Sequence, residues 1–283
     1  MALHQARSDT TNGSSLSYKR IVVKAGTNVL TSKRPSLDGE VMASLATQIA
    51  DVQTAGAQVV LVTSGAIAAG REAIGTPQDS NGLGVSQMLA AIGQSRLMRI
   101  YEELFSKRGI VVAQALLTRR DIDDQVGYLN IRNTLERLLE HSVVPIVNEN
   151  DVVDTAEINQ ERFGDNDTLS AVVADLVNAD LLIMLTDTRG LFTADPNRDP
   201  SATLVPRVER IDESVLKLAE VHRSKTTRGG MASKLEAAQK ATSAGVTVVI
   251  TSGAEANVVA RVARGEASGT MFPATARNAQ GES

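Results

Sequence analysis

Five short apolar runs recur along this chain, and each ends abruptly in small polar or charged residues. The runs have the length and β-branched content of interior strands of a parallel sheet, where both faces are covered and alternation disappears. They occupy residues 20–23, 58–62, 143–147, 181–185 and 246–250, and segments with helical spacing follow at 39–55, 129–140, 167–177 and 232–244. The alternation predicts an α/β fold with a mainly parallel sheet and helices on both faces.

The polar residues that follow these strands indicate where the function resides. The exits read K-A-G-T at 24–27, T-S-G-A at 63–66, N-E-N-D at 148–151, T-D at 186–187 and T-S-G at 251–253. In open α/β sheets, ligands bind beyond the carboxyl ends of the strands. We therefore expect one edge of the sheet to carry the site, and the amides and carboxylates of 148–151 to form part of it.

Composition excludes several classes of protein. The formal net charge of −4 gives no electrostatic reason to expect nucleic acid or an anionic membrane as a partner, and no apolar stretch approaches the length of a membrane span. The absence of cysteine excludes disulfides and thiolate chemistry. Residues 1–19 and 276–283 are polar and predicted to be disordered tails, and residues 20–275 read as one domain.

Familiar catalytic signatures are missing. The chain has no G-x-x-x-x-G-K-[ST], no G-x-G-x-x-G and no H-R-D, and its histidines, His4, His141 and His222, have no metal-ligand spacing. We therefore predict no protein metal site and no histidine-based triad.

Two lysines lie beside glycines. Lys24 leaves the first strand just before Gly26, whose lack of a Cβ lets backbone amides approach an anion. Gly229 and Gly230 open a helix that carries Lys234 in its first turn. A cation opposes the helix dipole there, which is expected where an anion compensates. The alternatives are a solvated lysine at a strand end and an ordinary glycine loop.

A third polar group, G-D-N-D-T at 164–168, opens another helix. Helix capping explains one such side chain, but three consecutive polar groups exceed what a cap needs. Ser64-Gly65-Ala66 is a similar helix start, suited to holding a carboxylate by backbone amides. Without G-x-S-x-G or an accompanying base, Ser64 is not expected to act as a nucleophile.

Six motifs together resemble the glutamate 5-kinase family. They are V-x-K-x-G-T at 22–27, V-T-S-G-A-I-A-A-G at 62–70, N-E-N-D at 148–151, G-D-N-D at 164–167, L-T-D-x-x-G-L-F-T-A-D-P at 185–196 and G-G-M-x-x-K at 229–234. Each is weak alone, but the order and spacing match the family over about residues 20–273. The resemblance implies the amino-acid kinase fold, a three-layer αβα sandwich with a mainly parallel central sheet.

The resemblance also implies a role for each motif residue, with ATP and Mg²⁺ as cofactors. It assigns Lys24, Lys234 and Asp167 to catalysis, with Asp167 holding the two lysines beside the transferred phosphoryl group. It assigns Ser64, Asn148, Asp151, Asp165 and Asn166 to L-glutamate. It assigns Lys24, Gly26, Thr27, Thr186, Asp187, Arg228, Gly229, Gly230, Met231, Ala232, Ser233 and Lys234 to the nucleotide.

The implied reaction is ATP-dependent phosphorylation of the γ-carboxylate of L-glutamate, the first step of proline biosynthesis. The resemblance further implies a cytoplasmic homo-oligomer, functional coupling to γ-glutamyl phosphate reductase, and proline as a feedback inhibitor, for which the polar segment 152–162 is the candidate. Many bacterial members carry Tyr at Phe192, a small residue at Arg228 and a C-terminal PUA domain that this sequence does not include. These departures bear on nucleotide binding, regulation and assembly.

Two alternatives remain at this stage. Another amino-acid kinase, for N-acetylglutamate or aspartate, would share the lysines and differ at the acceptor site. A non-catalytic sensor of nucleotide and amino acid is disfavoured by the retention of Lys24, Lys234 and Asp167. The apolar stripe at 86–105 is interpreted as core packing, with a subunit interface as the lesser alternative.

Overall fold

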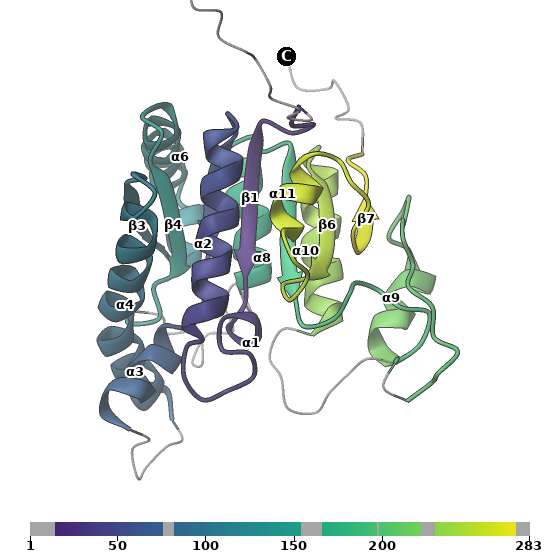
Figure 1. Ribbon diagram of the computed structural model, residues 1–283, viewed down its shortest axis with the longest axis horizontal. Helices are drawn as coiled ribbons and strands as arrows, with labels where there is room; N and C mark the ends of the chain where they lie inside the picture. The colour runs from purple at the N-terminus through teal and green to yellow at the C-terminus, as the bar shows by residue number, and fades with distance from the viewer. Residues whose placement is uncertain (1–14, 76–81, 154–165, 197, 222–229, 276–283) are drawn as a thin grey trace, which may run out of the picture.

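The central layer of the molecule is one seven-stranded sheet (Figure 1). The computed structural model describes residues 15–75, 82–153, 166–196, 198–221 and 230–275. The strand order is β3-β4-β2-β1-β5-β6-β7, with only β7 antiparallel to its neighbour. The strands are β1 Arg20–Ala25, β2 Gln58–Val62, β3 Val112–Leu117, β4 Val144–Glu149, β5 Leu181–Thr186, β6 Thr247–Ser252 and β7 Thr270–Phe272.

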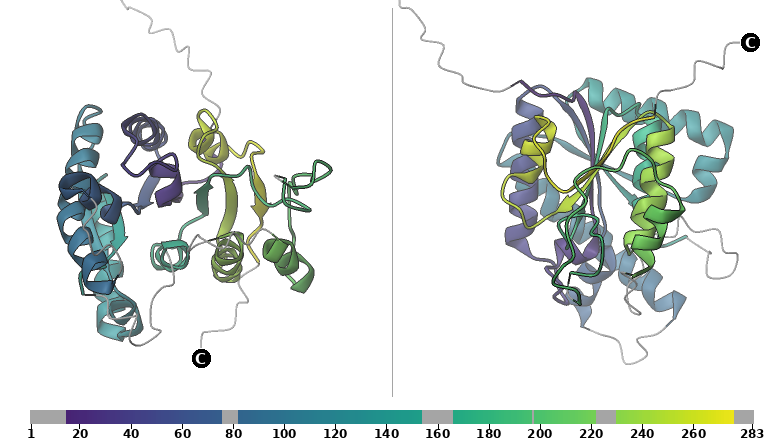
Figure 2. Two further views of the ribbon diagram at one scale, coloured as in Figure 1. Left: turned by 90° about the horizontal axis from the view of Figure 1, so that it is seen from below. Right: turned by 90° about the vertical axis from the view of Figure 1, so that its right-hand side faces the viewer.

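Helices cover both faces of the sheet and complete the expected three layers (Figure 2). One face carries α2 (Gly39–Thr54), α4 (Leu83–Ser106) and α11 (Val258–Ala263). The other carries α6 (Gln125–Glu140), α8 (Asn166–Leu176), α9 (Glu213–Val221) and α10 (Met231–Ser243). Shorter helices, α1 (Thr27–Leu30), α3 (Ala66–Ile74) and α5 (Arg119–Asp123), lie at the ends of strands.

The apolar runs become central strands because both of their faces are buried. In β1, Ile21 and Val23 pack with α2 and α11, while Val22 faces the layer of α8. All six residues of β5 are buried. Each fully buried Val, Leu or Ile contributes about 1.5–3 kcal/mol relative to exposure, so the middle of the sheet forms a rigid support. The carboxyl ends of its parallel strands, and the starts of the helices that follow them, share one edge.

The five predicted strands are confirmed, and two edge strands were missed. β3 is mostly half-buried, with only its last residue fully buried, and its Ala-Gln-Ala sequence lacks the β-branched run that marks the others. β7 is only three residues long. The core role predicted for the 86–105 stripe is confirmed for Leu89, Leu97 and Tyr101, which are buried in α4.

The folded unit includes residues before the predicted boundary at 20. The Ser17 N–H donates to the Ala263 carbonyl at 3.0 Å, and the Ser17 hydroxyl donates to the Arg264 carbonyl at 2.9 Å. Ser17, which lies in the stretch assigned from the sequence to a disordered tail, thus contacts α11 and its end. Among the described helices, none is long and apolar enough to cross a membrane.

Helices α3 and α4 pack through two glycines. A Cβ added at Gly93 would lie 1.7 Å from the Ala66 carbonyl oxygen, and one at Gly70 would lie 2.1 Å from the Leu89 carbonyl oxygen. No side chain fits at either position without moving backbone. This close approach fixes α4 against the start of α3, and it sets the position of Gln94, the residue after Gly93.

Candidate active site

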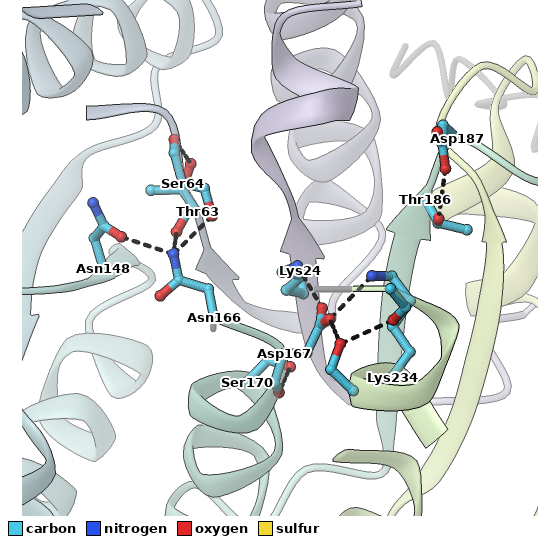
Figure 3. A network of polar contacts seen from close by, with 12 residues as sticks. Lys24, Thr63, Ser64, Asn148, Asn166, Asp167, Ser170, Thr186, Asp187 and Lys234 are labelled. Atoms are coloured by element: carbon cyan, nitrogen blue, oxygen red, sulfur yellow. Dashed lines mark hydrogen bonds and ion pairs between the residues drawn. The ribbon is translucent and has the colours of Figure 1, made fainter. Parts of the chain in front are cut away.

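Asp167 lies between the two lysines that the sequence singles out (Figure 3). The Lys24 ammonium forms an ion pair with Oδ1 of Asp167, and Lys234 Nζ lies 3.0 Å from Oδ2. The Asp167 side chain is fully buried, and Lys24 and Lys234 are 5% and 6% exposed. Lys24 comes from the end of β1, Asp167 from the first turn of α8 and Lys234 from the first turn of α10. The fold thus joins three distant segments in one charge cluster.

The two ammonium groups keep this carboxyl ionised. Burial by itself would raise the pKa of Asp167, but the charges and hydrogen bonds of Lys24 and Lys234 outweigh it and hold that pKa well below the ordinary value. The cluster carries two positive charges and one negative charge. Its net positive charge and the nearby amino ends of α8 and α10 favour an anion at this edge.

A second polar network lies at the ends of β2 and β4 (Figure 3). Asn166 Nδ2 donates to Ser64 Oγ at 2.7 Å, to the Thr63 carbonyl at 2.8 Å and to Asn148 Oδ1 at 3.1 Å. The Asn166 Oδ1 atom is buried and has no hydrogen-bond partner among the described residues. Because Asn166 directly precedes Asp167, this network is joined to the lysine cluster through the backbone of α8.

Gln94 extends the network and was missed by the sequence analysis. Asn148 Nδ2 donates to Gln94 Oε1 at 2.8 Å, and Gln94 is only 9% exposed. Gln94 and Asp151 line one small cavity of about 260 Å³, together with Ala90, Ala91, Ser95, Gln114, Leu116, Glu149, Asn150 and Val152. The cavity therefore places Asp151 beside Gln94, the partner of Asn148. The signal in the sequence was an amide inside an apolar helical stripe, at a position where the spacing expects a buried side chain.

A larger cavity of about 590 Å³ is lined in part by Lys234. Its lining contains five predicted nucleotide-site residues, Thr27, Thr186, Asp187, Gly230 and Met231, besides Lys234 itself. Phe192 also lines this cavity. Phenylalanine lacks the hydroxyl group of the tyrosine that many family members carry at this position. The other lining residues are Asn28, Thr31, Lys33, Arg34, Pro35, Ala68, Arg71, Thr188, Gly190, Asp195, Pro196 and Arg198.

Lys33 joins the wall of this cavity through an ion pair that the sequence analysis did not anticipate. Its Nζ lies 3.0 Å from Asp187 Oδ2, and the Asp187 side chain is 33% exposed. Partial burial would raise the pKa of Asp187, but the hydrogen bond and charge of Lys33 lower it below the ordinary value. Asp187 therefore presents a paired carboxylate to the cavity, beside Thr186 at the end of β5.

The remaining predicted residues divide into three groups. Gly26 lies against Lys24, and Ala232, in the first turn of α10, packs against the core. Ser233 contacts Asp167 through its hydroxyl group. Asp165, Arg228 and Gly229 lie outside the described residues, as does most of segment 152–162.

Within the described part of the chain, no group of three or more His, Asp or Glu side chains is arranged to hold a metal ion. The buried Asp167 carboxylate of the cluster is already paired with two lysines. These residues fit a magnesium ion that is carried by the phosphates of a bound nucleotide, the usual mode for Mg²⁺ in kinases.

The sequence of this chain is similar to those of known amino acid kinases. A profile described as the Amino acid kinase family matches residues 19–252. The chain is 52% identical over 255 residues to the glutamate 5-kinase of Dehalococcoides mccartyi (strain ATCC BAA-2266 / KCTC 15142 / 195), covering 90% of this chain and 68% of that protein. It is 51% identical over 261 residues to the glutamate 5-kinase of Shewanella amazonensis, covering 92% and 68%.

A solved structure supports the fold. The UMP kinase of Bacillus anthracis superimposes with a TM-score of 0.62 and 19% sequence identity, covering 92% of this chain and 97% of that one. At this identity the likeness bears on architecture alone, and it confirms the predicted three-layer arrangement. The two glutamate 5-kinases, at about half sequence identity, define the family more narrowly than the fold does. This chain therefore belongs to the glutamate 5-kinase family within the amino acid kinases.

Proposed function

We propose that this protein transfers the γ-phosphoryl group of ATP to the γ-carboxylate of L-glutamate and forms γ-glutamyl phosphate. The observation that carries the proposal is the position of the Lys24–Asp167–Lys234 cluster. It lies between the large cavity, lined by Lys234, Gly230 and Met231, and the amide network that begins at Asn166. A phosphate donor on one side and a carboxylate acceptor on the other would meet at the lysines.

The chemistry needs charge stabilisation and alignment more than a base. A carboxylate acceptor is already ionised at neutral pH, so no proton has to be removed before attack. Negative charge spreads over the phosphoryl oxygens in the transition state, and two ammonium groups beside it stabilise that charge. Asp167 suppresses the mutual repulsion of Lys24 and Lys234 and fixes where their remaining N–H groups point. A magnesium ion bound to the nucleotide would neutralise further phosphate charge.

The acceptor side suits a free amino acid. The buried Asn166 Oδ1 is an acceptor without a partner among the described residues, and Asp151 adds a carboxylate at the small cavity. Both favour a ligand that brings hydrogen-bond donors, as the ammonium group of glutamate does. An acetylated amine offers one donor and no charge, and an unpaired buried polar group costs about 1–3 kcal/mol. We therefore place L-glutamate ahead of N-acetylglutamate; the position of its side-chain carboxylate beside Lys24 would set the preference over aspartate.

The wider biological assignments follow from this activity. We propose that the enzyme acts in the cytoplasm, where ATP is available, as a homo-oligomer and as the first enzyme of proline synthesis. Its product is a reactive acyl phosphate, which favours coupling to γ-glutamyl phosphate reductase. Proline is proposed as the feedback inhibitor; Val152, at the start of the candidate segment, lines the small cavity beside Asp151.

The proposal is tested by trapping the product. With ATP, magnesium and hydroxylamine, L-glutamate should give the γ-hydroxamate together with one ADP per product, whereas N-acetylglutamate and L-aspartate should give at least about tenfold less. The tenfold threshold corresponds to about 1.4 kcal/mol of transition-state discrimination. A preference for either competing acceptor would overturn the assignment, and nucleotide binding without any product would make the protein a sensor. Including millimolar proline in the same assay tests inhibition.

A further inference from the structure

The hydroxyl group of Ser233 makes a contact that nucleotide binding does not explain. Ser233 Oγ lies 2.9 Å from Asp167 Oδ2, the same carboxylate oxygen that Lys234 Nζ approaches at 3.0 Å. Ser233 and Lys234 are neighbours in the first turn of α10, so one helix start supplies two donors to one buried oxygen. Ser233 is absent from the lining of the large cavity as the described residues define it.

The Ser233 hydroxyl has a second possible acceptor within its own helix. Ser233 Oγ also lies 2.9 Å from the carbonyl oxygen of Gly230, three residues earlier, a common local bond for serine in a helix. The hydroxyl has a single proton and donates to one acceptor at a time. The Gly230 carbonyl already accepts the backbone N–H of Lys234 at 3.4 Å, whereas a carboxylate is the stronger acceptor. The Ser233 hydroxyl therefore donates its hydrogen bond preferentially to Asp167.

We propose that Ser233 is a positioning residue for phosphoryl transfer, which acts by holding the Asp167 carboxylate in place. When Lys234 directs its N–H groups to phosphate oxygens, Asp167 Oδ2 still accepts a hydrogen bond from the Ser233 hydroxyl. Because this hydroxyl is neutral, the phosphate charge does not draw it away from Asp167. The orientation of the carboxylate, and with it the position of Lys24 on Oδ1, is then preserved through the reaction. Ser233 contributes to the rate without touching substrate.

The inference rests on phosphoryl transfer at this cluster and not on the identity of the acceptor. Rates should therefore be measured with whichever acceptor the wild-type enzyme uses best. Failure of glutamate as the acceptor and failure of the Ser233 effect are then separate results.

The first experiment compares Ser233→Ala with a matched change on the same helix. Ser243 Oγ donates to the Gln239 carbonyl at 2.8 Å, which is also a local serine bond in α10, but Ser243 is exposed and remote from Asp167. Ser233→Ala should lower kcat about tenfold to a hundredfold, as expected for a lost hydrogen bond to a charged group, with the Kd for ATP changed less than about threefold. Ser243→Ala should leave both unchanged. An unaltered kcat, or a weaker ATP affinity that accounts for the loss, would overturn the proposal.

A second comparison isolates the hydroxyl from the shape of the side chain. Ser233→Thr and Ser233→Val have nearly the same shape and differ in one hydroxyl group. Threonine should retain kcat within about threefold of wild type, and valine should reproduce the alanine defect at an equal melting temperature. Equal rates for the two would contradict a role for the hydroxyl. In an Asp167→Asn background the effect of Ser233→Ala should shrink below about threefold, because coupled residues are not additive; full additivity would show that Ser233 does not act through Asp167.

Discussion

Gly26 lies directly against the ammonium group of Lys24. A Cβ atom at residue 26 would be 3.1 Å from Lys24 Nζ, closer than most side-chain contacts, and 3.9 Å from its Cε, an ordinary contact distance. The backbone of Gly26 is extended, with φ −82° and ψ 164°, a conformation open to any residue. Any constraint on residue 26 therefore comes from the space that Lys24 occupies and not from backbone geometry. From the sequence, Gly26 was expected to admit an anion, and the structure adds this steric role.

Gly26→Ala should consequently impair catalysis more than folding. The new methyl group displaces the Lys24 ammonium by a few tenths of an ångström, and we expect kcat to fall about tenfold or more while the unfolding free energy changes by less than about 1 kcal/mol. Initial rates and denaturant unfolding measure the two effects. Gly39→Ala is the matched control, because a Cβ there meets nothing within 4 Å. Equal rates for the two variants would show that Lys24 has room to spare.

The acceptor side gives a second prediction, based on Gln94. Gln94→Leu keeps the size of the side chain but removes the acceptor of the Asn148 amide, which is 2% exposed. The unpaired N–H costs about 1–3 kcal/mol, so Asn148 is expected to turn away from Asn166. The KM for the acceptor should rise about tenfold or more, and the KM for ATP should stay within about threefold, in steady-state assays with each substrate varied.

Gln48 offers a control for that experiment, since it is also a buried glutamine. Its Oε1 accepts the Val259 N–H at 3.0 Å, on the opposite side of α2 from the acceptor network. Gln48→Leu should lower stability and leave both KM values near those of wild type. If Gln94→Leu raised the two KM values equally, Gln94 would have only a structural role.

Acid pH should reveal the buried charge cluster. The pKa of Asp167 in the folded protein is lowered below its value in the unfolded chain, so this carboxylate stabilises the fold fully above the unfolded-state pKa, about 3.9, and progressively less as the pH falls below it. The difference in unfolding free energy between wild type and Asp167→Asn should thus be constant between about pH 5 and about pH 7, and it should shrink below about pH 4. Urea titrations of both proteins across this range measure it. A difference that grew on acidification would reverse the sign of the pKa shift.

The sequence predicted the centre of the molecule better than its periphery. Strands β1, β2, β4, β5 and β6 were recognisable because burial on both faces demands continuous apolar residues. Edge strands such as β3 have one open side, so alanine and glutamine suffice there and no strong pattern is left. Periodicity likewise could not show that Gly70 and Gly93 let two helices touch, since the contact depends on three-dimensional packing.

The same distinction applies to the site. Lys24, Asp167 and Lys234 stood beside glycines and helix starts, where local sequence has a direct physical meaning, and the structure brings them together. Gln94 comes from the middle of a long helix, and its partner Asn148 is 54 residues away. The bond between Ser233 and Asp167 likewise spans 66 residues. Such contacts depend on how α4 and α10 pack against the sheet, which no local pattern records.

The central claim is that Asp167 organises Lys24 and Lys234 for phosphoryl transfer, and Asp167→Asn tests it most directly. Asparagine caps a helix about as well as aspartate, so a capping role alone predicts near-normal turnover. If the charge is needed, two buried ammonium groups are left facing each other, the fold loses about 3–5 kcal/mol, and both lysines move away from the phosphoryl oxygens. The measurement is kcat of the folded variant at saturating ATP and acceptor. We predict a fall of about 100-fold or more, and a kcat within about threefold of wild type would contradict the account.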